Sequence, residues 1–509
     1  MERDGFTSSI WQSETSYSSA GKLPKQTIFD VLIVGGGITG LATALALQSA
    51  GKNCVLIEAH EIGFGSTSGT TAHINTMLEK SYQEIAEDFS EENSNKVARA
   101  VQDSINLIRE NISRYQIDCD FSMQPGYMFS INEKQSKDLG AIVDYCVKLG
   151  VKAEYTVAQE FPFHYEKLAV FNDQAQFHPV KYIFGLAREF EKQGGVIIQH
   201  CRLTKLEKGS PSLAVTSLGN ISALQVVYAT HTPPGVNILH TLIAPYRSYV
   251  LAAELENEDY PEGLIYDLEE PYHYLRLYKQ QGKTYLIVGG ADHKTGTNDN
   301  SSGPYRDLEA YLRKYFHVKS IDNWWSSQFY DSADGLAYIG EMPGEGENVF
   351  VATGFGGTGM IYSHMSAIII KELILRGESE YGKIFSPKRI KPVASFSKFV
   401  KENAGVIKDL IAGILPREKL EVVSDLAHGE GRVVEYEGKK TGVYKDKSGH
   451  LFAVNPVCPH LKCTVEWNST ELSWDCPCHG SRFSYTGELI TGPATNNLEM
   501  YQLNMQSGL

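Results

Sequence analysis

The segment that decides the fold is residues 29–58, FDVLIVGGGITGLATALALQSAGKNCVLIE. The apolar run from Val31 to Val34 has the length and composition of a buried strand. A glycine-rich turn and an apolar helix follow, and Cys54–Ile57 has the pattern of a second short strand. Strand, turn, helix and strand in this order predict a Rossmann-type α/β unit near the start of the chain.

Three glycines and one acid make this unit a candidate nucleotide site. Gly35, Gly37 and Gly40 form Gly-x-Gly-x-x-Gly between strand and helix, and Glu58 ends the second strand. The glycines allow a tight turn, close approach of a pyrophosphate and close helix–strand packing, while the acid would accept a hydrogen bond from a ribose hydroxyl. A lone glycine motif is a weak signal, but here all four parts occur together. We therefore predict dinucleotide binding.

Four later segments resemble the D-amino-acid oxidase and glycine oxidase superfamily of FAD-dependent enzymes. Gly63–His73 resembles the loop that crosses the flavin pyrophosphate, and Val226–His231 resembles a second cofactor contact. Asp334–Gly340 and Gly354–Met360 resemble the carboxy-terminal flavin motif, whose backbone amides at a helix start would face the flavin. The resemblance implies FAD and a further set of contact residues. These are Ser66, Thr70, Thr71, Ala229, Thr230, Asp334, Gly354, Gly356, Gly357, Thr358, Gly359 and Met360.

The resemblance does not carry over a substrate. Amino-acid oxidases of the superfamily usually bind the substrate carboxylate through an arginine just ahead of the segment that matches Asp334–Gly340, and residues 327–333 contain none. Arg276 is the candidate catalytic residue, as a positive charge from the substrate sheet; the alternative is a structural ion-pair partner. His73 lies where some relatives attach flavin covalently, or is an ordinary loop histidine. His178 is expected to be a packing residue.

A second site is predicted near the other end of the chain, where four of the eight cysteines lie close together. Cys458 and His460 form Cys-x-His, and Cys476 and His479 form Cys-x-x-His. Two thiolates and two imidazoles are the ligand set of a Rieske 2Fe–2S centre. A four-cysteine zinc site is the alternative. The segments CPHLKC and WDCPCHGSRFS, with a later GPA, closely resemble the Rieske family.

The Rieske resemblance implies a role for each residue of this cluster. Cys458 and Cys476 would hold the buried iron, and His460 and His479 the outer one. Cys463 and Cys478 would form the disulfide found in Rieske proteins of the cytochrome bc type; two free thiols are the alternative. Two more positions affect the cluster, because Ser481 is the family's hydroxyl donor to sulfur and Phe483 stands where high-potential members have a tyrosine. We therefore expect an intermediate reduction potential.

The organisation follows from these motifs. We expect a polar N-terminal extension at 1–28, a discontinuous FAD-dependent oxidoreductase domain at 29–385, a linker and helix at 386–417, and the Rieske domain at 418–509. The predicted fold class is α/β plus all-β: a Rossmann-type FAD-binding domain with an antiparallel-sheet substrate subdomain, then a small all-β Rieske domain. No second Gly-x-Gly-x-x-Gly follows a strand, which counts against an NAD(P)H-dependent reductase.

Composition limits the partners. The net charge of −14 argues against nucleic acid and anionic membrane surfaces. The chain has no apolar run long enough to span a bilayer and no signal-peptide core, so we expect a cytoplasmic protein without stable membrane insertion. We expect FAD to take a hydride from a small, amine or amino-acid-like substrate and to pass electrons through the cluster to a protein or quinone acceptor. The alternative is an electron-transfer or sensing module without its own substrate.

Overall fold

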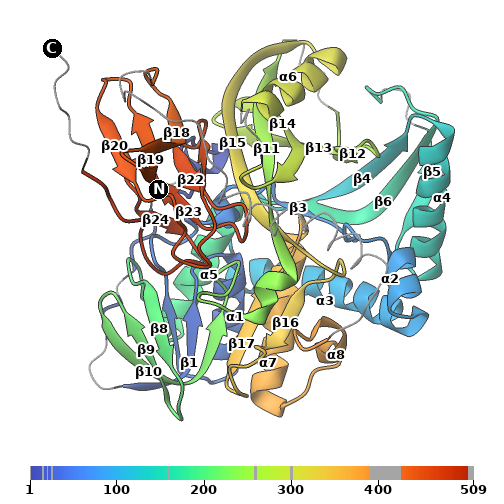
Figure 1. The fold of residues 1–509 in the computed structure, drawn as a ribbon. Helices are drawn as coiled ribbons and strands as arrows, with labels where there is room; N and C mark the ends of the chain where they lie inside the picture. The colour runs from blue at the N-terminus through green and yellow to red at the C-terminus, as the bar shows by residue number, and fades with distance from the viewer. Residues whose placement is uncertain are drawn as a thin grey trace.

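The computed structural model describes residues 2–13, 16–19, 21–23, 27–157, 161–256, 261–297, 302–389 and 426–502. Two large sheets and a small all-β domain make up this part of the chain, as the sequence predicted (Figure 1). All but the first four residues of the predicted linker and helix at 386–417 lie outside the described residues. Among the described helices, none combines the length and the apolar composition needed to cross a bilayer.

The cofactor sheet has eight strands, and β1 lies near its centre, parallel to both neighbours. The predicted strands in residues 31–34 and 54–57 are confirmed, and both are buried. Gly35 follows β1 with φ +116°, and a Cβ there would lie 2.3 Å from the carbonyl oxygen of Ala229, so the close approach of β1 to β10 requires glycine. The strands are β1 (Ile28–Val34), β2 (Cys54–Ile57), β7 (Val196–Ile198), β8 (Leu203–Glu207), β9 (Ser212–Thr216), β10 (Gly219–Tyr228), β16 (Tyr338–Glu341) and β17 (Val349–Thr353).

Helices α1 (Ile38–Gln48), α5 (Pro179–Lys192) and α7 (Gly359–Arg376) pack together beside this sheet. The buried face of α5 includes Tyr182, Ile183, Leu186 and Phe190. Residues 195–206 contain β7 and the start of β8, with His200 at φ +54° between them. A residue in the left-handed region ends an extended strand.

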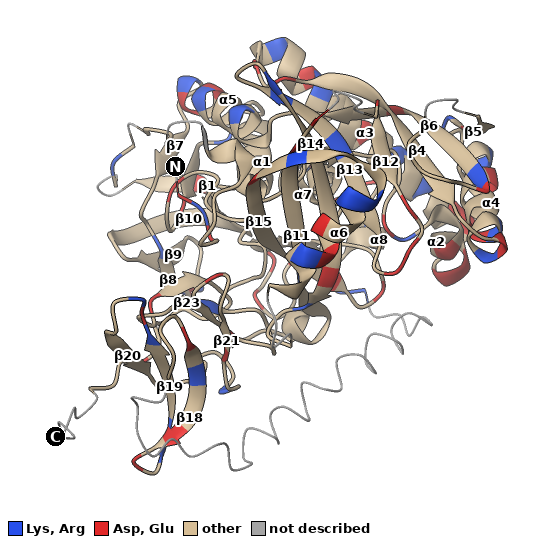
Figure 2. Cartoon of the chain, turned by 90° about the horizontal axis from the view of Figure 1, so that it is seen from above, with Lys and Arg blue, Asp and Glu red and all other residues tan. Residues whose placement is uncertain are grey.

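The second sheet has nine strands, which pair antiparallel except for β12 and β4. Charged residues lie mainly on the surrounding helices and strand ends, while β11 and β14 are largely uncharged (Figure 2). The strands are β3 (His73–Ile74), β4 (Ser122–Ser130), β5 (Ala153–Thr156), β6 (Lys167–Gln176), β11 (Ile243–Leu255), β12 (Leu264–Tyr266), β13 (His273–Gln280), β14 (Lys283–Lys294) and β15 (Val318–Ser332). The remaining helices are α2 (Tyr82–Asp88), α3 (Glu91–Tyr115), α4 (Glu133–Lys148), α6 (Gly303–Tyr315) and α8 (Gly382–Phe385), with 3-10 turns η1 (Ile10–Ser13), η2 (Ser66–Ser68) and η3 (Ile238–Thr241).

The carboxy-terminal domain contains two small antiparallel sheets around Val465, Trp474 and Phe483, which are fully buried. It lies beside β15 and next to the cofactor sheet (Figure 1). The strands are β18 (Gly431–Tyr436), β19 (Lys439–Lys445), β20 (Leu451–Val454), β21 (Glu466–Asn468), β22 (Ser473–Asp475), β23 (Arg482–Ser484) and β24 (Leu489–Thr491).

The N-terminal segment contributes to the core although its composition is polar. Trp11 is fully buried, and its indole Nε1 donates to the Thr70 carbonyl at 2.6 Å. Asp4 is also buried, and its carbonyl accepts a hydrogen bond from Arg482 Nη1 at 2.6 Å. The segment therefore fills space between the flavin-binding part and the carboxy-terminal domain.

Buried charges join the carboxy-terminal domain to β11. Arg482 lies 3.1 Å from Asp475 and 3.6 Å from Glu471, while Arg247 of β11 lies 3.7 Å from Glu471 and 3.8 Å from Asp475. Burial alone would raise the pKa of both acids, but the guanidinium charges of Arg247 and Arg482 outweigh it and lower the pKa of both. We call these four residues the interdomain ion network.

Loss of one acid from the interdomain ion network should destabilise the protein. Glu471→Gln leaves Arg247 and Arg482 with one carboxylate between them, and breaking a buried ion pair in this way costs about 3–5 kcal/mol. Glu437→Gln, in the exposed turn between β18 and β19, should change the free energy of unfolding by less than about 0.5 kcal/mol. Denaturant unfolding of both holo-proteins measures the difference. Equal stabilities would show that the network does not hold the domains together.

Candidate functional site

A cavity of about 960 Å³ lies between the two large sheets and extends to the carboxy-terminal domain. The turn after β1 and the end of β2 line one end, and β11, β13 and β14 contribute to the other. Gly492, Ala494 and Thr495 of the carboxy-terminal domain also line it. One cavity is therefore bounded by both parts of the chain.

Most of the residues expected to contact FAD lie in the wall of this cavity. Gly40 does not, because it packs against the turn, where an added Cβ would lie 1.9 Å from the Gly35 carbonyl. Gly354 is also outside the wall. Asp334 instead receives two 2.8 Å hydrogen bonds from the guanidinium of Arg389. The lining members of the set are Gly35, Gly37, Glu58, Ser66, Thr70, Thr71, Ala229, Thr230, Gly356, Gly357, Thr358, Gly359 and Met360.

The wall fits a dinucleotide cofactor. The first residues of α1 and of α7 line the cavity, so two helix N-termini supply backbone N–H groups and positive dipole ends. Glu58 accepts hydrogen bonds from the backbone N–H of Gly36 at 2.6 Å and of His60 at 2.9 Å, which holds its carboxylate at the end of β2. Several lining residues carry buried atoms that have no protein partner, and each of these atoms needs a ligand to bond; they include Thr232 Oγ1, His73 Nε2 and Asp292 Oδ1.

Arg276 does not line the cavity, and its contacts give it a structural role in place of the expected one. Its Nη1 donates to the carbonyls of Thr71 at 2.7 Å and of Ala72 and Phe177 at 3.2 Å. The guanidinium also lies over the ring of Trp11. It thus fixes the loop that carries Thr71. His178 caps α5 by accepting from the Lys181 N–H at 3.2 Å, as a packing residue would.

Cys458, His460, Cys476 and His479 lie together at one end of the carboxy-terminal domain. The two imidazole rings are 5.0 Å apart, and both Nδ1 atoms are buried without a hydrogen-bond partner. Burial lowers the pKa of both rings, to about 4 for His479, so both are neutral at neutral pH and each can bind a metal. His460 Nε2 donates to the Gly235 carbonyl at 3.1 Å, which leaves its Nδ1 lone pair free.

The sulfurs of this group are placed for iron. The Cys476 thiol contacts the Cys458 sulfur and lowers its pKa to about 7; burial opposes this, and the backbone N–H groups of His460 and Leu461 and the Ser481 hydroxyl reinforce it. Hydrogen bonds to thiolate sulfur are a feature of iron–sulfur sites. Two facing thiols and two unpartnered Nδ1 atoms therefore fit a 2Fe–2S cluster with mixed ligands.

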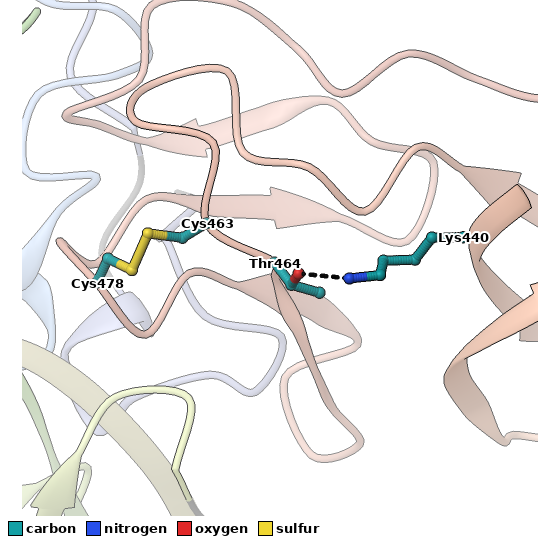
Figure 3. Close-up of a disulfide and its surroundings, with 4 residues drawn as sticks. All are labelled: Lys440, Cys463, Thr464 and Cys478. Carbon is teal, nitrogen blue, oxygen red and sulfur yellow. Dashed lines mark hydrogen bonds between the residues drawn. A yellow bond between two sulfur atoms is a disulfide. The ribbon is translucent and has the colours of Figure 1, made fainter. Parts of the chain in front are cut away.

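The predicted disulfide between Cys463 and Cys478 is present in the structure, with Cα atoms 6.5 Å apart (Figure 3). It joins the two loops that carry the four candidate ligands. Beside it, Lys440 Nζ donates to Thr464 Oγ1 at 3.2 Å. Because the disulfide engages two of the four clustered sulfurs, the four-cysteine zinc site is excluded.

The candidate ligands face the flavin-binding part of the chain. Gln328 Nε2 donates to the Gly480 carbonyl at 2.9 Å, and the Tyr330 hydroxyl donates to the His479 carbonyl at 3.1 Å. A Cβ on Gly480 would lie 2.6 Å from the Tyr330 oxygen. The ring of His240 packs 4.6 Å from that of His460. Gln328 and Tyr330 also line the cavity, so they contact both sites.

Comparison with known proteins identifies the family. Residues 30–373 match the family model described as FAD dependent oxidoreductase. The chain belongs to this family. Residues 418–502 match the Rieske [2Fe-2S] domain. The protein is therefore an FAD-dependent oxidoreductase with a carboxy-terminal Rieske domain, and its cofactors are FAD and a 2Fe–2S cluster.

Relatives of this oxidoreductase share one or both parts. YhfW of Bacillus subtilis (strain 168), named as a Rieske 2Fe-2S iron-sulfur protein, is 33% identical over 97% of both chains. Gamma-glutamylputrescine oxidoreductase of Escherichia coli (strain K12) is 26% identical over 72% of this chain and 88% of its own. The solved glycine oxidase of Geobacillus kaustophilus superposes with a TM-score of 0.59 at 18% identity, covering 71% of this chain and 99% of that one, which shows a shared fold.

Several residues of the oxidoreductase site were not predicted from the sequence. Glu79 and Tyr272 line the cavity but belong to no recognisable motif. Asp292 also lines the cavity and lies outside the motif segments described above. His240 contacts the candidate cluster ligands from a different domain. The local sequence around His240 does not predict a contact with residues so far away in the chain.

Ser481 should help to set the cluster potential of this oxidoreductase. Its Oγ accepts from the Ala494 N–H at 3.0 Å, which leaves the hydroxyl proton for the Cys458 sulfur. That bond strengthens when reduction adds negative charge, so Ser481→Ala should lower the potential by roughly 20–60 mV. Ser448→Ala, on an exposed loop of the same domain, should leave it unchanged. The potentials are measured by redox titration followed by EPR. Equal potentials in the two variants would show that the Ser481 hydroxyl does not affect the cluster potential.

Proposed function

We propose that this oxidoreductase oxidises a small molecule in the cavity and passes the electrons from FAD to the 2Fe–2S cluster, and then to an external acceptor. In this proposal Cys458 and Cys476 bind one iron, and His460 and His479 bind the other. FAD, when bound, accepts a hydride and can release its electrons singly, which suits a one-electron cluster. The lining residues described above would hold it.

The observation that carries the proposal is that the cavity for FAD extends to the cluster end of the Rieske domain. Ala494 lines the cavity, and its N–H is bonded to Ser481, whose hydroxyl contacts the Cys458 sulfur. On a second route, Tyr330 lines the cavity and donates to the carbonyl of His479. Both routes from cavity to cluster ligand involve only one or two residues.

Side chains of the flavin-binding part also cover the candidate histidine ligands. His240 is buried, its Nε2 lies 3.0 Å from the Pro233 carbonyl, and its ring contacts both ligand rings. Exclusion of water from this contact would strengthen the hydrogen bond from His460 to Gly235. We therefore assign His240 and Gly235 to docking of the cluster.

The external acceptor would approach another surface of the Rieske domain. Leu461 follows directly after a candidate ligand and is 39% exposed, and Lys462 beside it is exposed as well. Leu461 would offer an acceptor an apolar contact next to a cluster ligand. This edge lies close to the cluster and would serve a protein or quinone acceptor.

The relay is tested by oxidation of the reduced protein. Anaerobically reduced protein is mixed with cytochrome c, and reoxidation of the flavin is followed by its absorbance. We expect reoxidation to be slower by about tenfold or more in Cys476→Ser, because this change removes a cluster ligand. The same slowing is expected in Gly480→Ala, because the new Cβ meets Tyr330 and Gln328 and displaces the cluster. A tenfold change in rate corresponds to about 1.4 kcal/mol.

Gly438→Ala is the matched control for Gly480→Ala. Gly438 has φ +73° and Gly480 has φ +76°, so both substitutions impose the same backbone strain within one domain. A Cβ at Gly438 has no neighbour within 4 Å. Wild-type rates in Gly438→Ala together with slow reoxidation in Gly480→Ala support the relay. Wild-type rates in the cluster-free Cys476→Ser would overturn it.

A further inference from the structure

The substrate end of the cavity carries many acids and, among the described residues, no lysine or arginine. Arg202 is the one such residue in the described wall, and it lies at the Glu58 end, where its Nη2 bonds His60 Nε2 at 2.8 Å and the Leu489 carbonyl at 3.2 Å. The acids of the remaining wall are Glu79, Asp138, Asp267, Glu269, Glu270, Asp292 and Asp331.

Outside the wall, His273 bonds Asp267 at 2.8 Å, but the histidines that line this part of the cavity do not offset its acids. Burial lowers the pKa of His231 to about 4, and burial together with the charge of Arg276 lowers that of His73 well below its usual value. Both rings are therefore neutral at neutral pH. A substrate carboxylate would enter this part of the cavity without a positive partner and would meet like charges, which is costly in a site of low dielectric.

Two of the acids are held in place on this wall, Glu79 with an exposed side chain and Asp292 with a partly buried one. The Glu79 carboxylate accepts from the Tyr272 hydroxyl at 3.1 Å and from the Gly357 N–H, and an added Cβ on Gly356 would lie 2.2 Å from its Oε2. Asp292 Oδ1, at the end of β14, is buried and has no hydrogen-bond partner. No described ion pair neutralises either of them. A buried acceptor without a donor needs a ligand that can donate.

Aromatic rings lie beside these acids. The rings of Tyr272 and Tyr274 are 5.6 Å apart, and the Tyr274 hydroxyl shares a 2.9 Å hydrogen bond with Ser248. A Cβ on Gly289 would lie 2.3 Å from the Tyr274 ring, so glycine makes room for that ring. Tyrosine faces attract cations, and the attraction is stronger where water is excluded.

We infer that the substrate is a cationic amine that carries no carboxylate on its reacting carbon, and that Glu79 and Asp292 bind its ammonium group beside the rings of Tyr272 and Tyr274. This inference rests on the proposed function and names the substrate class for the same cavity. In amino-acid oxidases of the superfamily an arginine usually binds the substrate carboxylate, and this sequence lacks that arginine. Here two acids would instead bind the ammonium group of the substrate.

The chemistry requires one proton acceptor from the chain. An ammonium ion must lose a proton before oxidation, and Asp292 is suited to accept it, because burial raises its pKa to about 7 and the charge of Glu79 adds to this effect. The C–H bond beside the nitrogen then breaks, its hydrogen and electron pair pass to oxidised FAD, and a C=N bond forms. Water hydrolyses the iminium product to a carbonyl compound and an amine or ammonium ion.

A series of four-carbon and five-carbon probes tests the charge preference. The anaerobic holo-protein is mixed with n-butylamine, diaminobutane, γ-aminobutyrate or norvaline, and flavin reduction is followed by stopped-flow absorbance. For each probe, the rate constant of flavin reduction is divided by the Kd of the probe. We expect this ratio to be about tenfold or more higher for the monoamine and the diamine than for γ-aminobutyrate. Norvaline, with its carboxylate on the reacting carbon, should not reduce it. EPR of the same samples reports reduction of the cluster.

Binding without turnover tests the two acids. Tetramethylammonium has no lone pair on its nitrogen, so it cannot form the C=N bond and is not turned over. Its Kd is measured from the change that its binding causes in the flavin spectrum. Glu79→Gln and Asp292→Asn should each raise this Kd about tenfold, as expected when one close charge partner is lost in a desolvated site. Glu256→Gln, at an exposed position just after β11, should leave it unchanged.

The outcomes separate the inference from the proposed function. Flavin reduction by norvaline or γ-aminobutyrate as efficient as by the amines, or no effect of either acid on tetramethylammonium binding, would overturn the amine class and leave the relay intact. Reduction of the flavin by the amines without an EPR signal from the cluster would uphold the amine class and contradict the relay.

Discussion

Four buried charges at the boundary of the Rieske domain determine how that domain meets the rest of the chain. Arg482, Glu471 and Asp475 belong to one side, and Arg247 on β11 belongs to the other. Each charge would be costly alone in this environment, so the arrangement is stable only when the two sides meet in this register. Asp4 of the N-terminal segment completes it, at 3.9 Å from Arg482. The network thereby specifies one docked orientation of the Rieske domain.

Docking in this orientation has a chemical consequence, because it turns the candidate histidine ligands towards the flavin cavity. The Gly235 carbonyl accepts from His460, and Gly480 fits against Tyr330 only because it has no side chain. The cluster would then receive electrons through the side on which its outer iron lies. The exposed side chains of Leu461 and Lys462 would remain for an acceptor, so one small domain would contact donor and acceptor through different residues.

The sequence predicted the parts of the structure that depend on short-range patterns. The glycine spacing around Gly35, the strand at 54–57 and the pairing of Cys463 with Cys478 are local or follow the pattern of a known family, and the structure contains all three. The role of Arg276 depends instead on carbonyl groups about 100 and 200 residues away in the sequence. Its buried position among those carbonyls follows from tertiary packing, which a single sequence does not display.

The N-terminal segment and the acids of the cavity also have positions that depend on tertiary packing and could not be predicted from the sequence. Serine-rich composition predicted a polar extension, but Trp11 is fully buried, and burial of one large aromatic side chain is enough to anchor a polar segment. Glu79 and Asp292 are far apart in the sequence, and their shared position depends on the order of strands in the second sheet. Only the folded chain shows that acids gather at one end of the cavity, away from Arg202.

The central claim is that electrons move from FAD to the cluster within one molecule. It is tested most directly by reducing the flavin with a light pulse under anaerobic conditions and following absorbance of the cluster at several protein concentrations. The docked arrangement predicts that the cluster is reduced with a first-order rate constant that does not change with protein concentration. A rate that rises in proportion to protein concentration, or a reduced flavin beside a cluster that stays oxidised, would contradict it.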